Sequence, residues 1–297
     1  MTDGGAGSDG PGDLDLGTLE ETRILGGRVR LLQPRVGYRV AMDPILLAAA
    51  VPLHGSGPVR RVLDAGLGTG AAALCLLARG LADPGAAPDL TVTGIEQVSA
   101  VAALARRSAA LNGWTERLRV EVGDVTDATD GDYDLVLTNP PYGEAGRGTP
   151  PPQTGRAVAH VTAVSLAAWV AGCLARLRAK GRLVVIHRAD RLDDLLAALR
   201  GRAGAIEVIP LWPGPVAPGT QGARAARRVI VRARKGVRGP SHLSPGLMLH
   251  AAEGGHTAPA ERILRDGAAL DAVLSDTQEQ GSLTRPGPGA ITGPCSG

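Results

Sequence analysis

A tetrapeptide near the middle of the chain, Asn139-Pro140-Pro141-Tyr142, combines residue types that can activate an amino nitrogen. Such a nitrogen is planar and a poor nucleophile, because its lone pair is delocalised. The side-chain carbonyl of Asn139 and the backbone carbonyl of Pro140 can accept its two N–H bonds, which favours a tetrahedral nitrogen with a free lone pair. The paired prolines fix φ and stiffen the loop. The ring of Tyr142 offers a face on which a flipped base can stack.

The tetrapeptide is a specific signal in this composition. The chain has two Asn, three Tyr and 22 Pro among its 297 residues. A chance Asn-Pro-Pro-Tyr is therefore expected in roughly one of 10⁴ such sequences. A loop that only ends a strand is the simpler explanation, and the composition argues against it.

A glycine-rich stretch, Asp64-Ala65-Gly66-Leu67-Gly68-Thr69-Gly70, lies between an apolar run and an Ala/Leu-rich run. Glycines let the backbone turn tightly and approach a ligand closely at the start of a helix. The stretch fits two patterns, the dinucleotide fingerprint GxGxxG/A and the Asp-x-Gly-x-Gly-x-Gly loop that binds S-adenosyl-L-methionine (S-adenosylmethionine). Asp64 favours the second, because a carboxylate can pair with the methionine ammonium and would repel a pyrophosphate.

Two further acids are expected to contact such a cofactor. Glu96 follows the next predicted strand, where an acid can hold the ribose hydroxyls. Asp124 follows the third strand and is a candidate partner for the adenine amino group.

Alternating strand and helix patterns predict the elements that position these motifs. A hairpin is expected at 24–33, and Asp43 is expected to cap a helix that begins at Pro44. The remaining predicted strands are 61–65, 90–95, 118–122, 133–138, 182–186, 205–209 and 228–233, and the remaining helices end at 79 or span 99–111, 160–177 and 190–200. This alternation predicts a mostly parallel sheet with helices on both faces, in which ligands bind at the carboxyl ends of the strands.

Composition and charge exclude several classes of protein. The net charge is +3, and 30 of the 32 basic residues are Arg, which indicates GC-rich coding more than function. The stretch 202–238 carries eight bases and one acid, which suits either a polyanionic partner or a solvated strand edge. Three cysteines without a CxxC pair, and six scattered histidines, give no metal site or disulfide framework. Trp114, Trp169 and Trp212 are interpreted as packing residues.

The two ends of the chain differ from its middle. Residues 1–21 carry six acids without hydrophobic periodicity, and 271–297 are of low complexity, so both segments are expected to be disordered. The longest uncharged apolar run, 161–175, is shorter than the about 20 residues that span a bilayer. No apolar leader precedes it. These features predict a cytoplasmic protein without membrane or metal partners.

These motifs together resemble the class I S-adenosylmethionine-dependent methyltransferases that act on amino nitrogens. The chain is most similar to the valine-tRNA adenine-N6 methyltransferase family, over residues 22–270, with 22–60 as an N-terminal hairpin and helix. The segment 37–47, from Gly37 to Leu47, resembles the family's segment ahead of the cofactor loop. Residues 227–233 (RRVIVRA) resemble its last strand. The resemblance implies a Rossmann-like α/β fold with a seven-stranded, mostly parallel sheet whose last strand is antiparallel.

The resemblance also implies roles for individual residues, an S-adenosylmethionine cofactor and a tRNA substrate. Asn139, Pro140 and Tyr142 are the expected catalytic residues. The expected cofactor-binding residues are Asp43, Asp64, Gly66, Gly68, Gly70, Glu96 and Asp124. The expected substrate-binding residues are Pro141, Arg156, Arg227 and Arg228.

Other activities remain open at this point. The same tetrapeptide could serve methylation of a glutamine N5 in a release factor, or of an amino group in rRNA or DNA. A non-catalytic RNA factor that binds S-adenosylmethionine is a third possibility. An NAD-dependent oxidoreductase fits the glycine-rich stretch, but no plausible acid or base residue accompanies the tetrapeptide.

Overall fold

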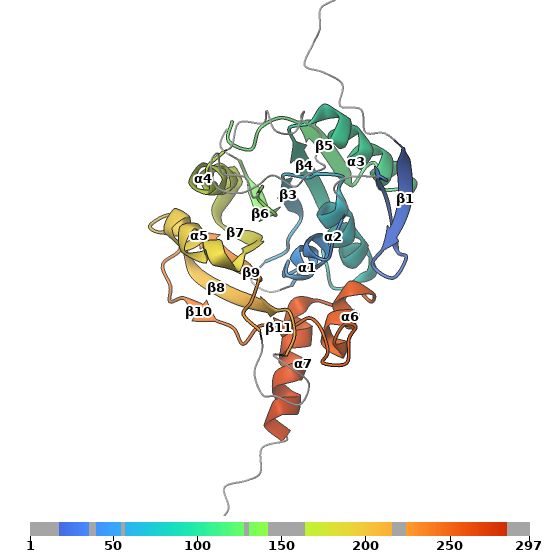
Figure 1. The fold of residues 1–297 in the computed structure, drawn as a ribbon. Coiled ribbons are helices and arrows are strands. Elements are labelled where there is room, and N and C mark those ends of the chain that lie inside the picture. The colour runs from blue at the N-terminus through green and yellow to red at the C-terminus, as the bar shows by residue number, and fades with distance from the viewer. Residues whose placement is uncertain are drawn as a thin grey trace, which may run out of the picture.

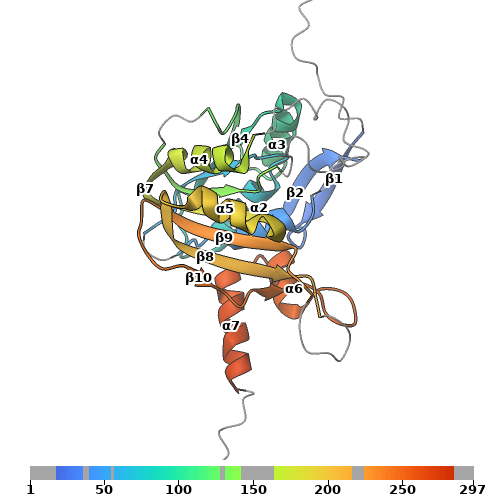
Figure 2. The same ribbon diagram turned by 60° about the vertical axis from the view of Figure 1, so that its left-hand side comes forward.

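A central sheet covered by helices on both faces forms the body of the protein (Figures 1 and 2). The computed structural model describes residues 18–35, 40–54, 57–127, 131–141, 164–215 and 224–283. A two-stranded hairpin lies against one side of this body, and a C-terminal helix projects from it (Figure 1).

Nine strands among the described residues form the central sheet, in the order β10-β8-β9-β7-β6-β3-β4-β5, with β11 also paired to β8. The seven main strands are β3 (Arg61–Ala65), β4 (Thr91–Glu96), β5 (Leu118–Val122), β6 (Tyr133–Thr138), β7 (Leu177–Arg188), β8 (Ala203–Trp212) and β9 (Arg228–Lys235). Strand β9 runs antiparallel to both its neighbours, whereas β7, β6, β3, β4 and β5 pair in parallel. The predicted seven-stranded topology is confirmed. Two short strands, β10 (His242–Leu243) and β11 (Leu247–Met248), extend it beyond β8.

Helices cover both faces of the sheet because alternate strand residues point to opposite sides. Leu135 and Leu137 of β6 belong to one core cluster, and Val136 between them belongs to the other. The first cluster includes residues of α1 (Asp43–Ala49), α2 (Ala71–Ala82), α3 (Ser99–Leu111), α6 (Ala258–Leu264) and α7 (Leu270–Leu283). The second includes residues of α4 (Leu166–Arg176) and α5 (Leu192–Leu199), and a short 3₁₀ turn, η2 (Ala189–Arg191), precedes α5.

The predicted N-terminal hairpin is present but longer than the expected 24–33, because its strands are β1 (Leu19–Ile24) and β2 (Val29–Pro34). Its second strand docks on the end of α3, where the Arg30 backbone N–H donates to Asn112 Oδ1 at 2.9 Å and Asn112 Nδ2 donates to the Arg30 carbonyl at 2.7 Å. The hairpin turn contacts the segment after α6, because Arg28 Nη2 donates to the Arg265 carbonyl at 2.7 Å. The hairpin thereby touches two parts of the chain that are remote from it in sequence.

The boundaries expected for the two disordered ends are wrong. Strand β1 begins at Leu19, inside the segment 1–21. Helix α7 occupies residues 270–283, most of which we expected to be part of a disordered tail. Leu270 and Val273 are fully buried in the first core cluster, so one short apolar stripe holds this helix against the body. The polar composition of the segment conceals that stripe.

Strand β7 also begins earlier than expected, at Leu177 instead of residue 182. Its register with β6 shifts, because Tyr133 pairs with Leu177 whereas Leu135 pairs with Arg182. A bulge therefore accommodates the extra residues of β7, and Lys180 within it has a φ of +62°. The polar sequence Arg-Ala-Lys-Gly resembles a turn between a helix and a strand, which explains the error. Helix α4 likewise starts at Leu166, and residues 160–163 of the expected helix lie outside the described residues.

Candidate active site

The carboxyl ends of the parallel strands form one edge of the sheet. At this edge lie the glycine-rich loop, the two acids and the described residues of the tetrapeptide. Ala65, the last residue of β3, is in register with Ile95 of β4 and with Thr138 of β6. The backbone N–H of Gly123 donates to the Glu96 carbonyl at 3.0 Å, which holds the end of β5 beside the end of β4. Asn139 therefore follows the strand directly beside the one that carries the glycine-rich loop.

The glycine-rich loop needs glycine at two positions for different reasons. Gly66 has a φ of +79°, and a Cβ there would lie 3.0 Å from the Trp169 ring. Gly68 has a φ of +57°, and no atom lies within 4 Å of the place where its Cβ would be. The backbone at Gly68 is thus open to close approach by a ligand. Gly70 is the N-cap residue of α2.

Asp64 is the buried carboxyl group of this site, with 2% of its surface exposed. Its Oδ2 accepts the Ala73 backbone N–H at 3.1 Å. Burial raises the pKa of Asp64 well above its usual value, the Ala73 hydrogen bond opposes that shift, and the negative charge of Glu96 adds to it. A cation bound nearby would offset the cost of keeping this carboxylate charged.

Glu96 and Asp124 are held by neighbouring backbone groups. The Glu96 carboxylate accepts the Gly68 N–H through Oε2 and the Val98 N–H through Oε1, both at 2.9 Å. Asp124 Oδ1 accepts the Thr126 backbone N–H at 2.7 Å. Glu96 therefore connects the end of β4 to the glycine-rich loop, and both carboxylates are oriented without a ligand.

A buried indole connects the glycine-rich loop to the end of β6, directly ahead of the tetrapeptide. Trp169 of α4, 5% exposed, lies against Gly66 and donates its Nε1–H to Thr138 Oγ1 at 2.9 Å. The Thr138 hydroxyl in turn donates to the Ala65 carbonyl at 2.7 Å. The packing role predicted for Trp169 is confirmed by its burial. The chain of hydrogen bonds was not predicted, because the spacing of these residues in the sequence gives no sign of it.

The tetrapeptide itself is described as far as its third residue. Asn139 is half-buried, Pro140 is buried and Pro141 is exposed. Tyr142 and Arg156, for which we expected base stacking and RNA contact, lie outside the described residues.

The prediction that Asp43 caps α1 is wrong. Met42 occupies the cap position, the helix begins at Asp43, and Pro44 is its second residue. The Asp43 carboxylate instead accepts a hydrogen bond from Arg228 Nε at 2.8 Å, and both side chains are at least two-thirds buried. One expected cofactor residue and one expected RNA-binding residue therefore form an ion pair that joins α1 to β9.

Four arginines lie at the end of β7, in η2 and at the start of β9, and we call them the arginine cluster: Arg188, Arg191, Arg227 and Arg228. Arg188 ends β7 in register with Arg228, which begins β9, and the Ala189 N–H donates to the Arg227 carbonyl at 3.1 Å. Carboxylates pair with three of them, Asp190 with Arg188, Asp194 with Arg191 and Asp43 with Arg228.

The arginine cluster acts on the buried side chain of His187. Burial and the charges of Arg191, Arg228 and Arg188 lower the pKa of His187 to about 4. The imidazole is therefore neutral at physiological pH. The positive charge at the end of β7 and the start of β9 is that of the arginine side chains.

The described residues hold no group of three or more His, Cys, Asp or Glu placed to bind a metal ion. In the same part of the chain, no helix has the length and apolar character needed to cross a membrane. The two cysteines described, Cys75 and Cys173, are free thiols in the core.

The strand order, the antiparallel last main strand and the glycine-rich loop after the first parallel strand define a class I S-adenosylmethionine-dependent methyltransferase fold. The chain belongs to the methyltransferase small domain family, whose model matches residues 45–206. S-adenosylmethionine is the cofactor of this class, and the site fits it. A buried carboxyl, an open glycine backbone and two oriented carboxylates suit a ligand with an ammonium, a sulfonium and ribose hydroxyls.

Known proteins resemble the chain in sequence and in structure. A tRNA1(Val) (adenine(37)-N6)-methyltransferase of Aeromonas hydrophila is 32% identical over 163 residues, which cover 54% of this chain and 64% of that protein. A protein of the same description from Yersinia pestis is 36% identical over 112 residues, 36% of this chain and 41% of that protein. The chain thus matches less than two thirds of either relative.

A solved structure extends over more of the chain. It is a predicted O-methyltransferase, Atu636 of Agrobacterium tumefaciens, with a TM-score of 0.59 and 26% identity. The match covers 77% of this chain and 97% of that one. The likeness supports the fold, and the description of that protein as an O-methyltransferase contrasts with the amino-nitrogen chemistry of the two sequence relatives.

Proposed function

We propose that this protein transfers a methyl group from S-adenosylmethionine to the exocyclic amino nitrogen N6 of an adenine in tRNA, in the cytoplasm. One observation carries the proposal. Asn139 and Pro140 directly follow β6. Strand β6 pairs in parallel with β3, the strand that leads into the glycine-rich loop. Acceptors for an amino group and a loop for the methyl donor are thereby adjacent.

The cofactor half of the site consists of Asp64, Glu96, Asp124 and the glycines 66, 68 and 70. Bound S-adenosylmethionine supplies an electrophilic methyl group on a sulfonium. Asp64 pairs with the methionine ammonium, and that cation stabilises a carboxylate which burial otherwise disfavours. Glu96 accepts the ribose hydroxyls, and Asp124 accepts the adenine amino group. Asp43 supports the site through α1 and its ion pair with Arg228.

The substrate half activates the nitrogen. Asn139 Oδ1 and the Pro140 carbonyl accept the two N–H bonds of the adenine amino group, so that its lone pair points at the methyl group. Pro141 keeps the loop stiff, and Tyr142 stacks on the flipped base. No general base is needed before transfer, because the nitrogen loses its proton readily once it carries the new methyl group. Positioning supplies most of the rate enhancement.

The tRNA substrate rests on the two sequence relatives and on charge. Both relatives are described as tRNA1(Val) (adenine(37)-N6)-methyltransferases. The arginine cluster lies at the same edge of the sheet as Asn139, at the ends of β7 and β9, and its carboxylate partners can give way to RNA phosphates. Arg156 and the cluster member Arg227 are the further residues that we assign to RNA contact.

Methyl transfer into tRNA tests the proposal directly. Labelled S-adenosylmethionine and the protein are incubated with total tRNA that lacks the modification, and the nucleosides are then analysed. We expect N6-methyladenosine as the labelled product. Label in a ribose or base oxygen would contradict the proposed nitrogen chemistry, and S-adenosylmethionine binding without turnover on any substrate would indicate a non-catalytic RNA factor.

A second candidate keeps the chemistry and changes the substrate. The Asn139-Pro140 acceptors serve equally well for glutamine N5 of a protein, or for an amino group of rRNA or DNA. Salt separates the protein substrate from the nucleic acids, because phosphate contacts release counterions and weaken steeply between 50 and 200 mM salt. Activity on a release factor that survives this change would move the substrate to the protein class.

A further inference from the structure

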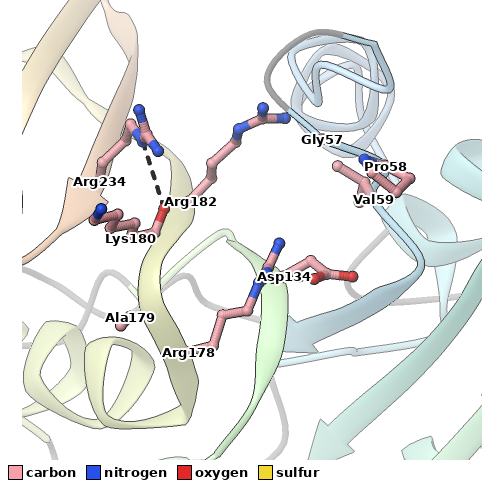
Figure 3. Close-up of a pocket in the computed structure, with 9 residues that line it drawn as sticks. All are labelled: Gly57, Pro58, Val59, Asp134, Arg178, Ala179, Lys180, Arg182 and Arg234. Atoms are coloured by element: carbon pink, nitrogen blue, oxygen red, sulfur yellow. Dashed lines mark hydrogen bonds and ion pairs between the residues drawn. The ribbon is translucent and has the colours of Figure 1, made fainter.

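A recess lies at the opposite end of the strands from the active site, near the amino ends of β3 and β6, and we call it the basic pocket. It is bounded by the segment 57–59 ahead of β3, Asp134 of β6, Arg178, Lys180 and Arg182 of β7, and Arg234 of β9 (Figure 3). Asp134 and Asn139 are five residues apart along one strand, about 16 Å. The pocket volume of about 190 Å³ far exceeds the about 15 Å³ that one water molecule needs.

The side chains that line the basic pocket carry a large excess of positive charge. Four of them are cationic and one, Asp134, is a carboxylate. That carboxylate is already engaged, because Oδ1 pairs with Arg178 Nε at 2.8 Å and Oδ2 accepts the backbone N–H groups of Arg60 and Arg61 at 2.9 Å each. The lining therefore has three positive charges more than negative ones.

A neighbouring arginine shows how the chain balances such a charge elsewhere. Arg232 lies on the same face of β9 as Arg234 and pairs with Glu207 at 3.0 Å and Asp271 at 2.6 Å. Arg234, two residues further along, instead donates to the Lys180 carbonyl at 3.4 Å. A carbonyl group orients this guanidinium group but does not neutralise its charge. Arg182 is oriented in part by the Pro52 carbonyl, to which it donates at 3.2 Å.

The cations that line the basic pocket disfavour one another's charge. Burial lowers the pKa of Arg182, the charges of Arg234, Arg178 and Arg232 lower it further, and the carboxylate of Asp134 opposes the shift. Lys180 adds its charge from a backbone with a φ of +62°, a left-handed conformation that is strained for a residue other than glycine. Figure 3 shows Arg182 extending from β7 toward the segment 57–59 while Arg178 lies beside Asp134. An anion placed among these side chains would relieve their repulsion.

We propose that the basic pocket is an anion site that binds a phosphate group. Four cationic donors around a small recess suit a tetrahedral oxyanion, since guanidinium groups bind phosphate through two parallel hydrogen bonds. The phosphate comes either from a small free molecule or from the backbone of a bound RNA. The site is separate from methyl transfer, because it lies at the other end of the strands.

The first experiment measures binding of inorganic pyrophosphate to the full chain by titration calorimetry at low salt, without cofactor or RNA. Lys180→Gly removes one charge and suits the positive φ, so this variant is expected to fold at least as well as the parent chain. We expect it, and Arg234→Gln, to bind pyrophosphate about tenfold more weakly. Arg119→Gln is the matched control, because that arginine is exposed on the distant strand β5 and should leave binding unchanged.

The second arm distinguishes the two sources of phosphate. If RNA is the source, both variants lower tRNA affinity, and the slope of log affinity against log salt falls by about one. If a free phosphate is the source, pyrophosphate affinity falls while tRNA affinity is unchanged. The proposal is overturned if the parent chain binds no pyrophosphate and the variants leave tRNA affinity and its salt slope unchanged.

These measurements are independent of the proposed methyl transfer. Pyrophosphate binding requires no turnover, and Asn139→Ala is expected to retain it. Loss of activity in Asn139→Ala with unchanged pyrophosphate affinity would therefore support both proposals separately, whereas absent methyl transfer with intact pyrophosphate binding would remove only the first.

Discussion

The two halves of the active-site edge hold their charged groups in opposite ways. In the half formed by β3, β4 and β5 the charges are carboxylates, and backbone N–H groups orient them, as Ala73 orients Asp64 and Gly68 orients Glu96. In the half formed by β7 and β9 the charges are guanidinium groups, and side-chain carboxylates pair with them, as Asp43 does with Arg228. Asn139 follows β6, the strand between the two halves.

This difference distinguishes a fixed site from an exchangeable one. A backbone N–H cannot move away without rearranging its loop, so the carboxylates of the half formed by β3, β4 and β5, which we call the acidic half, are held in one orientation. An exposed ion pair such as that of Arg188 with Asp190 contributes only about 0–1 kcal/mol, so a phosphate can replace its carboxylate at little cost. The proposed cofactor and substrate match these two modes, one being a compact cation-bearing molecule and the other an extended polyanion.

The largest expected effect is at the boundary between the halves. Asn139→Ala removes one of the two proposed acceptors for the amino group, so kcat should fall about 10²–10³-fold. Affinity for S-adenosylmethionine should be nearly unchanged, because the residue lies outside the acidic half. Single-turnover rates and calorimetric binding measure the two quantities. Equal turnover by this variant would eliminate the proposed mechanism.

The next effect sharpens the role of the acidic half. Asp64→Asn removes the buried carboxylate that we assign to the methionine ammonium, and we expect S-adenosylmethionine to bind about 30-fold more weakly, a loss of about 2 kcal/mol. Asparagine has a similar shape and carries no charge to bury. The cofactor-free variant should therefore be at least as stable as the parent chain at neutral pH.

The pH dependence gives the same test without a mutation. Because the pKa of Asp64 is raised in the folded state, its protonated form stabilises the fold. This contribution to the free energy of unfolding is fully present below pH 3.8 and is lost as the pH rises through the raised pKa. Cofactor affinity should change in the opposite direction and weaken as Asp64 gains a proton on acidification. Asp64→Asn should abolish both dependences, and an unchanged pH profile of cofactor binding would argue against the ammonium contact.

A smaller effect is expected from the hydrogen bond between Trp169 and Thr138, the last residue of β6. Trp169→Phe keeps the ring against Gly66 but loses the hydrogen bond to Thr138, worth about 0.5–1.5 kcal/mol, so kcat should fall about 2–12-fold with little change in KM. Trp212→Phe is a matched control, because its indole donates to the Pro245 carbonyl at 2.9 Å at the end of β8, three strands away from β6. An equal loss of kcat in both variants would show that Trp169 acts through general stability.

The smallest effect concerns the arginine cluster. Arg227→Gln should lower tRNA affinity about twofold at physiological salt and reduce the salt slope by about one, with kcat at saturating tRNA unchanged. Binding measured between 50 and 200 mM salt reports both values, and Arg119→Gln again serves as the control. If the slope were the same as in the parent chain, Arg227 would not contact phosphate.

Elements that are defined by local periodicity could be predicted from the sequence. Strands β3, β5 and β6 and helix α3 begin and end where the pattern placed them, because each has a continuous apolar face and a clear turn at either end. The edge that carries Asp64, Glu96 and Asn139 followed from the same logic, since parallel strands end together.

Features that depend on contacts between remote side chains could not be predicted. Asp43 looked like a helix cap because of its neighbour Pro44, whereas its actual partner, Arg228, lies 185 residues away. The hydrogen bond from Trp169 to Thr138 has no periodic signature. The bulge at Lys180 gathers cations that the sequence distributes over two separate strands.

The contact between the hairpin turn and the segment after α6 has a consequence for synthesis of the chain. The hydrogen bond from Arg28 can form only after Arg265, 237 residues later in the chain, has been synthesised. At about 5–20 residues per second, the ribosome needs roughly 12–47 s to make that stretch. Strands β3 to β6 are therefore made well before Arg265, whereas β9, which pairs with β7 and β8, ends at Lys235, only 30 residues before it. This contact therefore forms late in folding of the new chain. In a nascent chain arrested before residue 265, the turn would be exposed to proteases and chaperones.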